Sequence, residues 1–366
     1  MKNIGENIKR IRLANGISQK EIIDACELSK QGYINIEKGE SVPSINTLTL
    51  IAKALGVKID ELLSEPTKLK SLRYRVMKVS DEKDKSKMMQ DEIKLAKWLE
   101  NYKFLENQLQ DYRPYLFDSI ATACPKAASA EARKLLNLGD KEAINDIISL
   151  LEFAGVKIYL YTSALRQSFG MSVSAADGAY VVAVNTKDSI PIERQIFTAA
   201  HELGHLILHK NSYDAGEFIE NDTEEIEANA FASHFLMPDE LFNYKIEETQ
   251  GKHWVDRIIH TKIFFKVSYK TVLYRLIESG KANQDIYMKF NIDFKKRYNK
   301  DLKDHFEPFA VQDSLMFSKH DYLADRFNRL VKLAYEQDLI TTAKAADLLS
   351  MSIAEFKDLS NSWSII

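Results

Sequence analysis

Apolar positions in the first part of the chain follow the spacing of short amphipathic helices. The opening run places its apolar side chains at helical intervals, at Ile4, Ile8, Ile11 and Leu13. Ser18 and Glu21 then have the spacing of a capping box, in which a hydroxyl and a carboxylate each accept a hydrogen bond from an exposed backbone N–H at a helix start. Two further helices, over residues 30–38 and 47–55, are each preceded by a capping serine and followed by a glycine. The pattern predicts five short helices over residues 4–63.

A second apolar stripe follows a charged stretch at residues 81–87, which divides a small N-terminal head from the rest of the chain. The stripe has members spaced alternately three and four residues apart, at Leu95, Trp98, Tyr102, Leu105, Leu109 and Tyr112. This is the spacing of a coiled-coil seam. The stripe predicts a helix that pairs with a second copy of the chain to form a homodimer. The alternative is that it packs onto its own chain.

Two further patterns predict a strand in the middle of the chain and a pair of helices near its C-terminus. Residues 178–185 form an apolar run that predicts a strand, and this strand could be a sheet edge that pairs with an extended substrate. Residues 341–356 predict a helix, a Ser/Met turn and a helix, which we interpret as an interaction or packing module.

Composition narrows the classes of function. The chain has 366 residues, a length that suggests two or three domains, and no apolar run of membrane-spanning length. Its 50 basic and 53 acidic residues give a net charge of -3, so any nucleic-acid site must be a local patch. The two cysteines, Cys26 and Cys124, have no CxxC partner, which fits a reducing compartment and excludes a cysteine-built zinc site. We therefore expect a cytoplasmic protein with no membrane contact.

The head resembles the phage-repressor-like (XRE/Cro-type) helix-turn-helix family over residues 4–63. The resemblance is carried by Gly-Ile-Ser-Gln at residues 16–19 and Glu-Lys-Gly-Glu-Ser-Val-Pro at residues 37–43. It implies operator DNA as a partner, with the third helix lying in the major groove. Carried over to this sequence, the base-reading candidates are Lys30, Gln31 and Asn35, and the phosphate-binding candidates are Gln19 and Lys38. The alternative for the head is a protein-interaction module.

The central candidate for chemistry is the sequence His-Glu-Leu-Gly-His. On a helix, His201 and His205 share one face one turn apart, so both imidazoles can bind one metal ion while Glu202 points at the water that the ion binds. Pro191 favours the start of such a helix ahead of the motif. Two histidines leave a catalytic zinc ion one protein ligand short.

The third ligand is sought in the acidic helical run that follows. Glu225 lies twenty residues after His205, a spacing similar to that of thermolysin-like zincins, whose third ligand is a Glu on the following helix. Glu227 is the rival, but it projects about 200° around the helix from Glu225. Asn229, one turn after Glu225, would hydrogen-bond a ligand imidazole and fix its orientation, and His209 is expected to support the site without binding the metal.

The two motifs together resemble the ImmA/IrrE (M78-type) metallopeptidases. The resemblance is carried by HELGHLILH at residues 201–209, EEIEANAFASHFLMP at residues 224–238 and the helical run at residues 265–276. It covers residues 128–280 and implies an α+β zincin core, Zn²⁺ as cofactor, and site-specific cleavage of proteins that are often helix-turn-helix repressors. Glu202 would take the proton of the water and pass it to the leaving amine.

We therefore predict a multidomain chain. It has an all-α helix-turn-helix head (1–64), a charged helical connector (65–118), an α+β zincin-like metallopeptidase domain (119–250) and an α-helical C-terminal region (251–366). The predicted function is a regulatory zinc endopeptidase with a DNA-binding head. The alternatives are a DNA-binding transcription regulator or antitoxin-like protein whose metal domain senses or scaffolds, and a pure interaction protein.

Overall fold

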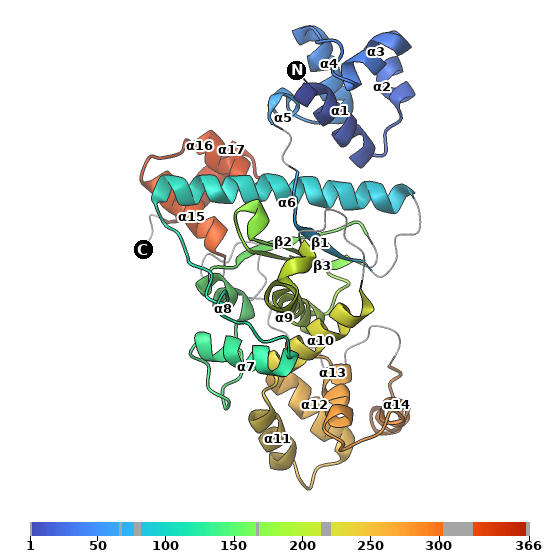
Figure 1. Ribbon diagram of the computed structural model, residues 1–366, viewed down its shortest axis with the longest axis vertical. Coiled ribbons are helices and arrows are strands. Elements are labelled where there is room, and N and C mark those ends of the chain that lie inside the picture. The colour runs from blue at the N-terminus through green and yellow to red at the C-terminus, as the bar shows by residue number, and fades with distance from the viewer. Residues whose placement is uncertain are drawn as a thin grey trace. The chain divides into compact units, whose positions relative to one another are not determined.

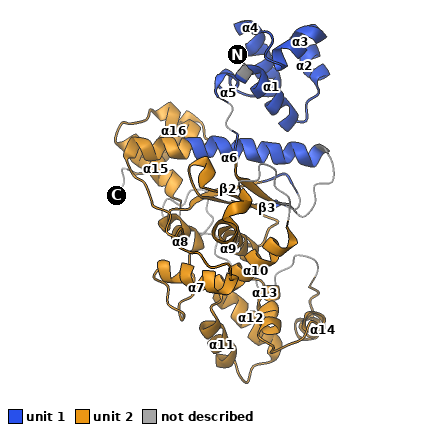
Figure 2. Cartoon of the chain, in the orientation of Figure 1, with its two compact units in different colours: residues 1–69, 76–100, 163–168 blue, residues 70–75, 101–162, 169–366 orange. Residues whose placement is uncertain are grey.

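A computed structural model describes residues 2–65, 68–76, 82–165, 168–213, 221–302 and 325–363 (Figure 1). The chain divides into two compact units, coloured separately in Figure 2. The first unit comprises residues 1–69, 76–100 and 163–168, and the second comprises residues 70–75, 101–162 and 169–366. Among the described residues, no helix combines the length and apolarity that crossing a bilayer requires. The domain boundaries given above stay a prediction.

The head consists of five helices, as the apolar spacing predicts. Their bounds are α1 (Lys2–Ala14), α2 (Gln19–Cys26), α3 (Lys30–Glu37), α4 (Ile45–Leu55) and α5 (Ile59–Leu63). Ser18 and Glu21 form the predicted capping box of α2, and Ser29 and Ser44 cap α3 and α4. Gly56 ends α4 in the left-handed conformation, at φ 70°. Helix α4 begins two residues earlier than predicted, but all five helices are confirmed.

The charged stretch does not separate two elements. Its residues from 82 onward form the first turns of one long helix, α6 (Glu82–Leu109), and residue 81 lies outside the described residues. Lys and Glu are strong helix formers, and Lys87 lies 3.2 Å from Asp84 one turn away. The stretch is therefore the start of a helix, and its place as a boundary between domains stays a prediction.

Part of the apolar stripe on α6 packs within the chain, as the alternative expectation has it, and the homodimer stays a prediction. Tyr102 and Leu105 are fully buried. The Tyr102 ring lies 5.7 Å from the ring of Phe327 on α15 (Arg326–Glu336). Tyr112 lies beyond the helix and is exposed. An amphipathic stripe shows that the helix buries one face, but it does not identify the surface that covers that face. Here α15 covers the part of the stripe around Tyr102.

The second unit is built on a four-stranded mixed sheet. Its strands are β1 (Leu72–Val76), β2 (Lys157–Tyr161), β3 (Ser168–Val173) and β4 (Val181–Asn185), and they lie in the order β1-β3-β4-β2. Strand β4 pairs antiparallel with β3 and parallel with β2. It is therefore a central strand, and the predicted edge for substrate pairing is wrong: both sides of β4 already have a hydrogen-bonded neighbour.

Helices pack around this sheet and continue its core. Helix α9 (Ile192–Leu208) packs against β4, α8 (Ile147–Phe153), α7 (Pro125–Leu135) and α10 (Asp222–Leu236). One apolar cluster runs from Phe117 to Phe294 and so includes residues on both sides of residue 250. It also takes in α11 (Asp239–Glu248), α12 (Trp254–Phe265), α13 (Tyr269–Glu278) and α14 (Ile286–Tyr298).

The C-terminal helices have the predicted shape. Helices α16 (Thr342–Leu348) and α17 (Ile353–Trp363) are joined by a short turn, and Ser352 and Glu355 hydrogen-bond reciprocally at the start of α17. Phe356 is fully buried against Tyr335 and Trp363. The predicted fold class is confirmed: a helical head, a part with a small mixed sheet and helices, and a helical C-terminal region.

Candidate metal centre

Two neighbouring helices bring the candidate ligands together. His201 and His205 lie on the buried face of α9, and Glu225 lies on α10, which packs directly against it. Gly204 permits this close approach, because a Cβ at that position would lie 3.0 Å from Phe231 Cδ1 and 3.3 Å from Ala228 Cα. The glycine inside the histidine motif therefore sets the spacing between the two helices.

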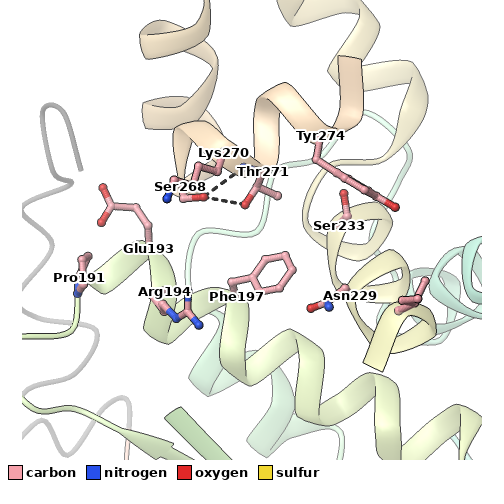
Figure 3. Close-up of a pocket in the computed structure, with 11 residues that line it drawn as sticks. Pro191, Glu193, Arg194, Phe197, Asn229, Ser233, Ser268, Lys270, Thr271 and Tyr274 are labelled. Carbon is pink, nitrogen blue, oxygen red and sulfur yellow. Dashed lines mark hydrogen bonds between the residues drawn. The ribbon is translucent and has the colours of Figure 1, made fainter. Parts of the chain in front are cut away.

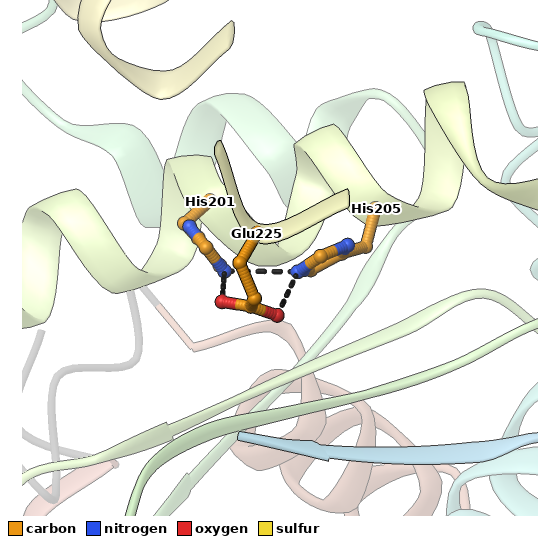
Figure 4. Close-up of side chains that lie close together, drawn as sticks. All are labelled: His201, His205 and Glu225. Atoms are coloured by element: carbon orange, nitrogen blue, oxygen red, sulfur yellow. Dashed lines mark hydrogen bonds and ion pairs between the residues drawn. The ribbon is translucent and has the colours of Figure 1, made fainter. Parts of the chain in front are cut away.

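Three side chains face a common point (Figure 4). The Nε2 atoms of His201 and His205 are 2.9 Å apart. The two carboxylate oxygens of Glu225 lie 3.3 Å and 3.1 Å from these nitrogens, respectively. Both imidazoles are fully buried, and the Glu225 side chain is 19% exposed. These separations place all three side chains within reach of one small cation.

The donor set fits zinc. A tetrahedral zinc ion binds His nitrogen and carboxylate oxygen at about 2.0–2.2 Å, so its ligand atoms are about 3.3–3.6 Å apart. The separations of 2.9–3.3 Å among His201, His205 and Glu225 are close to these edges. Two imidazoles and one carboxylate are also the ligand set of catalytic zinc sites that keep a fourth position for water.

Hydrogen bonds behind the rings fix the tautomers that a metal needs. His201 Nδ1 lies 3.0 Å from Asn229 Oδ1, an acceptor, so Nδ1 carries the hydrogen and Nε2 presents its lone pair. His209 donates from Nε2 to Glu227 over 2.9 Å, and its Nδ1 lies 2.9 Å from His205 Nδ1. When His209 accepts at Nδ1, His205 carries its hydrogen on Nδ1 and also turns its Nε2 lone pair toward the centre.

Glu202 is held from the opposite side by the sheet. Ser172 on β3 donates from its hydroxyl to Glu202 Oε2 over 2.6 Å, and Tyr213 donates to the Ser172 hydroxyl over 2.8 Å. Gly170 lets β3 come this close, because a Cβ there would lie 2.5 Å from Thr198 Cγ2 and 3.0 Å from Glu202 Oε1. The Glu202 carboxylate is therefore both buried and oriented.

Burial and hydrogen bonding set the charges of the cluster. Burial lowers the pKa of the His205 imidazole well below its usual value, so the ring stays neutral and able to bind a cation. Burial acts to raise the pKa of Glu225, but hydrogen bonds from His201 and His205 outweigh it and hold this pKa well below its usual range. Burial, and then the Glu202 carboxylate, raise the pKa of Tyr213, so its hydroxyl keeps the proton that it donates.

The structure brings together all the residues predicted for the centre. His201, His205 and Glu225 converge, and Asn229 and His209 stand behind the imidazoles. Their roles as ligands and supports stay predictions. The sequence analysis missed Arg73 and Ser172, which hydrogen-bond Glu225 and Glu202, and their own partners Glu224 and Tyr213, because sheet pairing and helix packing bring these residues close.

A cavity of about 370 Å³ adjoins the candidate centre (Figure 3). Asn229 forms part of its wall, and Phe197 reaches it from the turn of α9 that precedes His201. The other lining side chains include Arg194, Ser233, Lys270 and Tyr274. Its size and its mixture of aromatic and polar walls are those of a pocket that receives a side chain or a small ligand.

The head places its predicted DNA-binding residues on α2 and α3. Lys30, Gln31 and Lys38 are exposed, and Asn35 is half-buried and accepts a hydrogen bond from the Gln31 amide over 2.8 Å. Gln19 is half-buried and donates to Glu37 over 2.6 Å. Nothing in these contacts tests the predicted base and phosphate roles.

Two family models match the chain. The model described as Helix-turn-helix matches residues 8–62, and the model described as IrrE N-terminal-like domain, of the peptidase M78 family, matches residues 154–277. The cryptic phage CTXphi transcriptional repressor RstR of Vibrio cholerae is 31% identical over 86 residues, which are 22% of this chain and 77% of that protein. The chain belongs to the helix-turn-helix family, and its residues 154–277 are similar to the M78 peptidase domain. Its M78 segment contains the histidine motif and Glu225.

Other relatives match one part of the chain each. Metallopeptidase ImmA of Bacillus subtilis (strain 168) is 28% identical over 138 residues, which are 36% of this chain and 76% of that protein. The SPbeta prophage-derived uncharacterized HTH-type transcriptional regulator YonR of the same organism is 39% identical over 59 residues, which are 16% of this chain. The chain spans 55% of the length of YonR. These relatives support the joining of a repressor-like head to an M78 domain.

Proposed function

We propose that this chain is a zinc-dependent endopeptidase with a DNA-binding head, and that its substrate is a repressor-type protein. The convergence of His201, His205 and Glu225 beside a buried Glu202 carries the proposal. The match of residues 154–277 to the M78 peptidase domain and the similarity to a protein named metallopeptidase ImmA support it. A domain kept only as a scaffold would need no oriented carboxylate next to its metal ligands.

Each side chain of the centre has its own role in peptide hydrolysis. Zinc, when bound, supplies a Lewis acid that polarises the scissile carbonyl and brings the pKa of a water molecule to about 7. Glu202 accepts a proton from the attacking water and returns it to the nitrogen of the leaving amine. Ser172 holds the Glu202 carboxylate by one oxygen during this transfer. The adjoining cavity receives a substrate side chain next to the scissile bond.

The head would bring this activity to DNA in the cytoplasm. Lys30 and Gln31 project from the first turn of α3 into solvent, where a major groove could reach them. The similarity to the repressor named above, over 86 residues, supports this role for the head. A substrate that itself binds an operator would then be cleaved where it is bound.

The test of the peptidase is the Glu202→Gln variant. It keeps the shape of the side chain but loses the proton acceptor, so we expect one bound zinc per chain and at least a 100-fold loss in the rate of cleavage of candidate repressors. Glu240→Gln, an exposed carboxylate on α11, is the matched control and should cleave normally. Equal cleavage by both variants would refute the proposal. Regulation that persists in Glu202→Gln would favour the DNA-binding regulator with a sensory or structural metal domain.

The test of the head is operator binding at several salt concentrations. The double change Lys30→Ala and Gln31→Ala removes two base-reading candidates, so it should weaken specific binding at every salt concentration and relax the preference for the operator sequence. Lys94→Ala on α6 removes an exposed lysine outside the helix-turn-helix segment and serves as the control. Binding unchanged by the double change would leave the head as a protein-interaction module.

A further inference from the structure

The strand that follows the head in the chain places a buried arginine side chain next to the candidate metal centre. Strand β1 lies at one edge of the sheet beside β3, and its Arg73 side chain is only 3% exposed. One guanidinium nitrogen forms an ion pair with Glu224, and the other lies 3.3 Å from Glu225 Oε1. Arg73 lies outside both family-matched segments, residues 8–62 and 154–277.

Arg73 separates two competing carboxylates. Glu224 is itself close enough to His205 and His209 to form a second potential metal group. In the structure, however, Arg73 donates a hydrogen bond to Glu224, and the Ser212 hydroxyl donates to Glu224 Oε1 over 2.5 Å. Glu225 is left to face the imidazoles. Only a planar guanidinium can bond two adjacent carboxylates in fixed directions, since a lysine ammonium is a single point charge on a flexible stem.

The strand has its own anchor away from the ligands. The backbone N–H groups of Lys70 and Ser71 donate to the Asp177 carboxylate over 2.8–3.0 Å, and the Ser71 hydroxyl donates to it over 2.7 Å. Asp177 lies in the turn between β3 and β4. The backbone entering β1 is thus fixed to the second unit at the point where the chain leaves the head.

We propose that Arg73 is a positioning residue for the zinc ligand Glu225, and that the docking of β1 completes the metal centre. The inference rests on the proposed function, because it assumes that Glu225 binds zinc. Arg73 repels a dication, but its ion pair with Glu224 is neutral overall, so its main effect is on the geometry of Glu225. The segment next to the head thereby controls the affinity of the centre for its metal.

The experiment measures zinc affinity of the full chain by competition with a chromophoric chelator. Arg73→Gln should weaken zinc binding about 10- to 100-fold, the usual effect of losing a hydrogen-bond partner of a ligand. Arg73→Lys should recover part of this loss, and Asp177→Ala, which only releases the anchor, should show a smaller loss. Arg297→Gln, which removes an exposed ion pair with Asp256, is the control and should bind zinc like the parent.

The absorption spectrum of the Co²⁺-loaded protein separates positioning from general stability. A change in the geometry of Glu225 should shift the visible bands in Arg73→Gln but not in Arg297→Gln. Zinc affinity within twofold of the parent together with an unchanged spectrum would overturn the inference while leaving the peptidase proposal intact. If Arg73→Gln does not fold, Arg73→Lys and Asp177→Ala decide by the same two readouts. A parent chain that binds no zinc would refute the proposed function as well.

Discussion

Each imidazole of the candidate centre owes its orientation to one acceptor behind it. For His201 this is Asn229, and for His205 it is the pair formed by His209 and Glu227. Because each acceptor holds the hydrogen on Nδ1, both Nε2 lone pairs point at the same place without a change of protonation. Both imidazoles are therefore oriented for a cation by the groups behind them, and Glu225 is the ligand that brings negative charge.

At the residue scale, we expect Ser172→Ala to impair the chemistry and spare the metal. The change removes the donor to Glu202, and a hydrogen bond to a charged group contributes about 1.5–3 kcal/mol. Cleavage should slow by about 10- to 100-fold while zinc stoichiometry stays at that of the parent. Ser129→Ala, another buried serine in the same unit whose hydroxyl donates to a backbone carbonyl, is the control. Zinc loss in Ser172→Ala would contradict the role given to Ser172.

A second residue-scale prediction concerns the stability of the head. Glu37 is buried and accepts hydrogen bonds from Arg12, Tyr33 and Gln19. Burial acts to raise its pKa, but these partners, Arg12 first, outweigh it and lower the pKa below the usual value. A carboxyl with a lowered pKa stabilises the fold above its unfolded pKa and loses that effect as pH falls. The head should therefore become less stable to denaturant below about pH 4.3.

Glu37→Gln tests this interpretation. It leaves Arg12 without its charged partner, and breaking a buried ion pair costs about 3–5 kcal/mol. At pH 7 the variant should unfold at lower denaturant concentration, and the acid-dependent part of the decline should be smaller than in the parent. An identical pH profile for both proteins would show that Glu37 is not the group responsible.

At the scale of elements, local patterns predict helices and their ends well but not neighbours across the fold. Ser18 and Glu21 cap α2 because both partners lie within one turn of the chain. The two histidines and Glu225 could be found because their spacing places them on helix faces. The central position of β4 in the sheet could not be predicted in this way. The order of the strands depends on how β1 and β3 pair, and the local sequence pattern does not show that pairing. For the same reason Arg73, far from the motif in sequence, was not predicted.

The packing of α9 on α10 gives a prediction at this scale. Gly204→Val would place side-chain atoms where Phe231 and Ala228 already lie 3.0–3.3 Å from a Cβ. The helices must move apart, at a cost of about 1–3 kcal/mol, and Glu225 moves away from the imidazoles. We expect weaker zinc binding and a lower melting temperature. Gly139→Ala, where a Cβ meets only Glu142 at 3.9 Å, should change neither.

At the scale of the whole molecule, the apolar stripe of α6 shows what the sequence does not predict, namely which part of the protein covers a buried face. Its spacing predicts a helix with a buried face, and this is correct. The same spacing is satisfied whether the apolar surface that covers this face comes from a second chain or from the chain itself. Tyr102 is buried against Phe327, a contact between residues on α6 and α15 that are far apart in sequence. The identity of that partner becomes evident only when the whole fold is known.

The division into two units predicts how metal removal acts. A ligand present at 100 times its dissociation constant stabilises the unit that binds it by about 2.7 kcal/mol. Chelation should therefore lower the melting temperature of the second unit, which contains His201, His205 and Glu225, and leave the transition of the first unit unchanged. Calorimetry of the full chain with and without chelator measures this. A shift of both transitions, or of neither, would contradict a zinc site confined to the second unit.

The most direct test of the central claim is anomalous diffraction at the zinc absorption edge from crystals of the zinc-loaded full chain. The account predicts one strong peak, about 2.0–2.2 Å from Nε2 of His201, Nε2 of His205 and a carboxylate oxygen of Glu225. A peak held by other side chains, or the absence of any peak among these three, would contradict it.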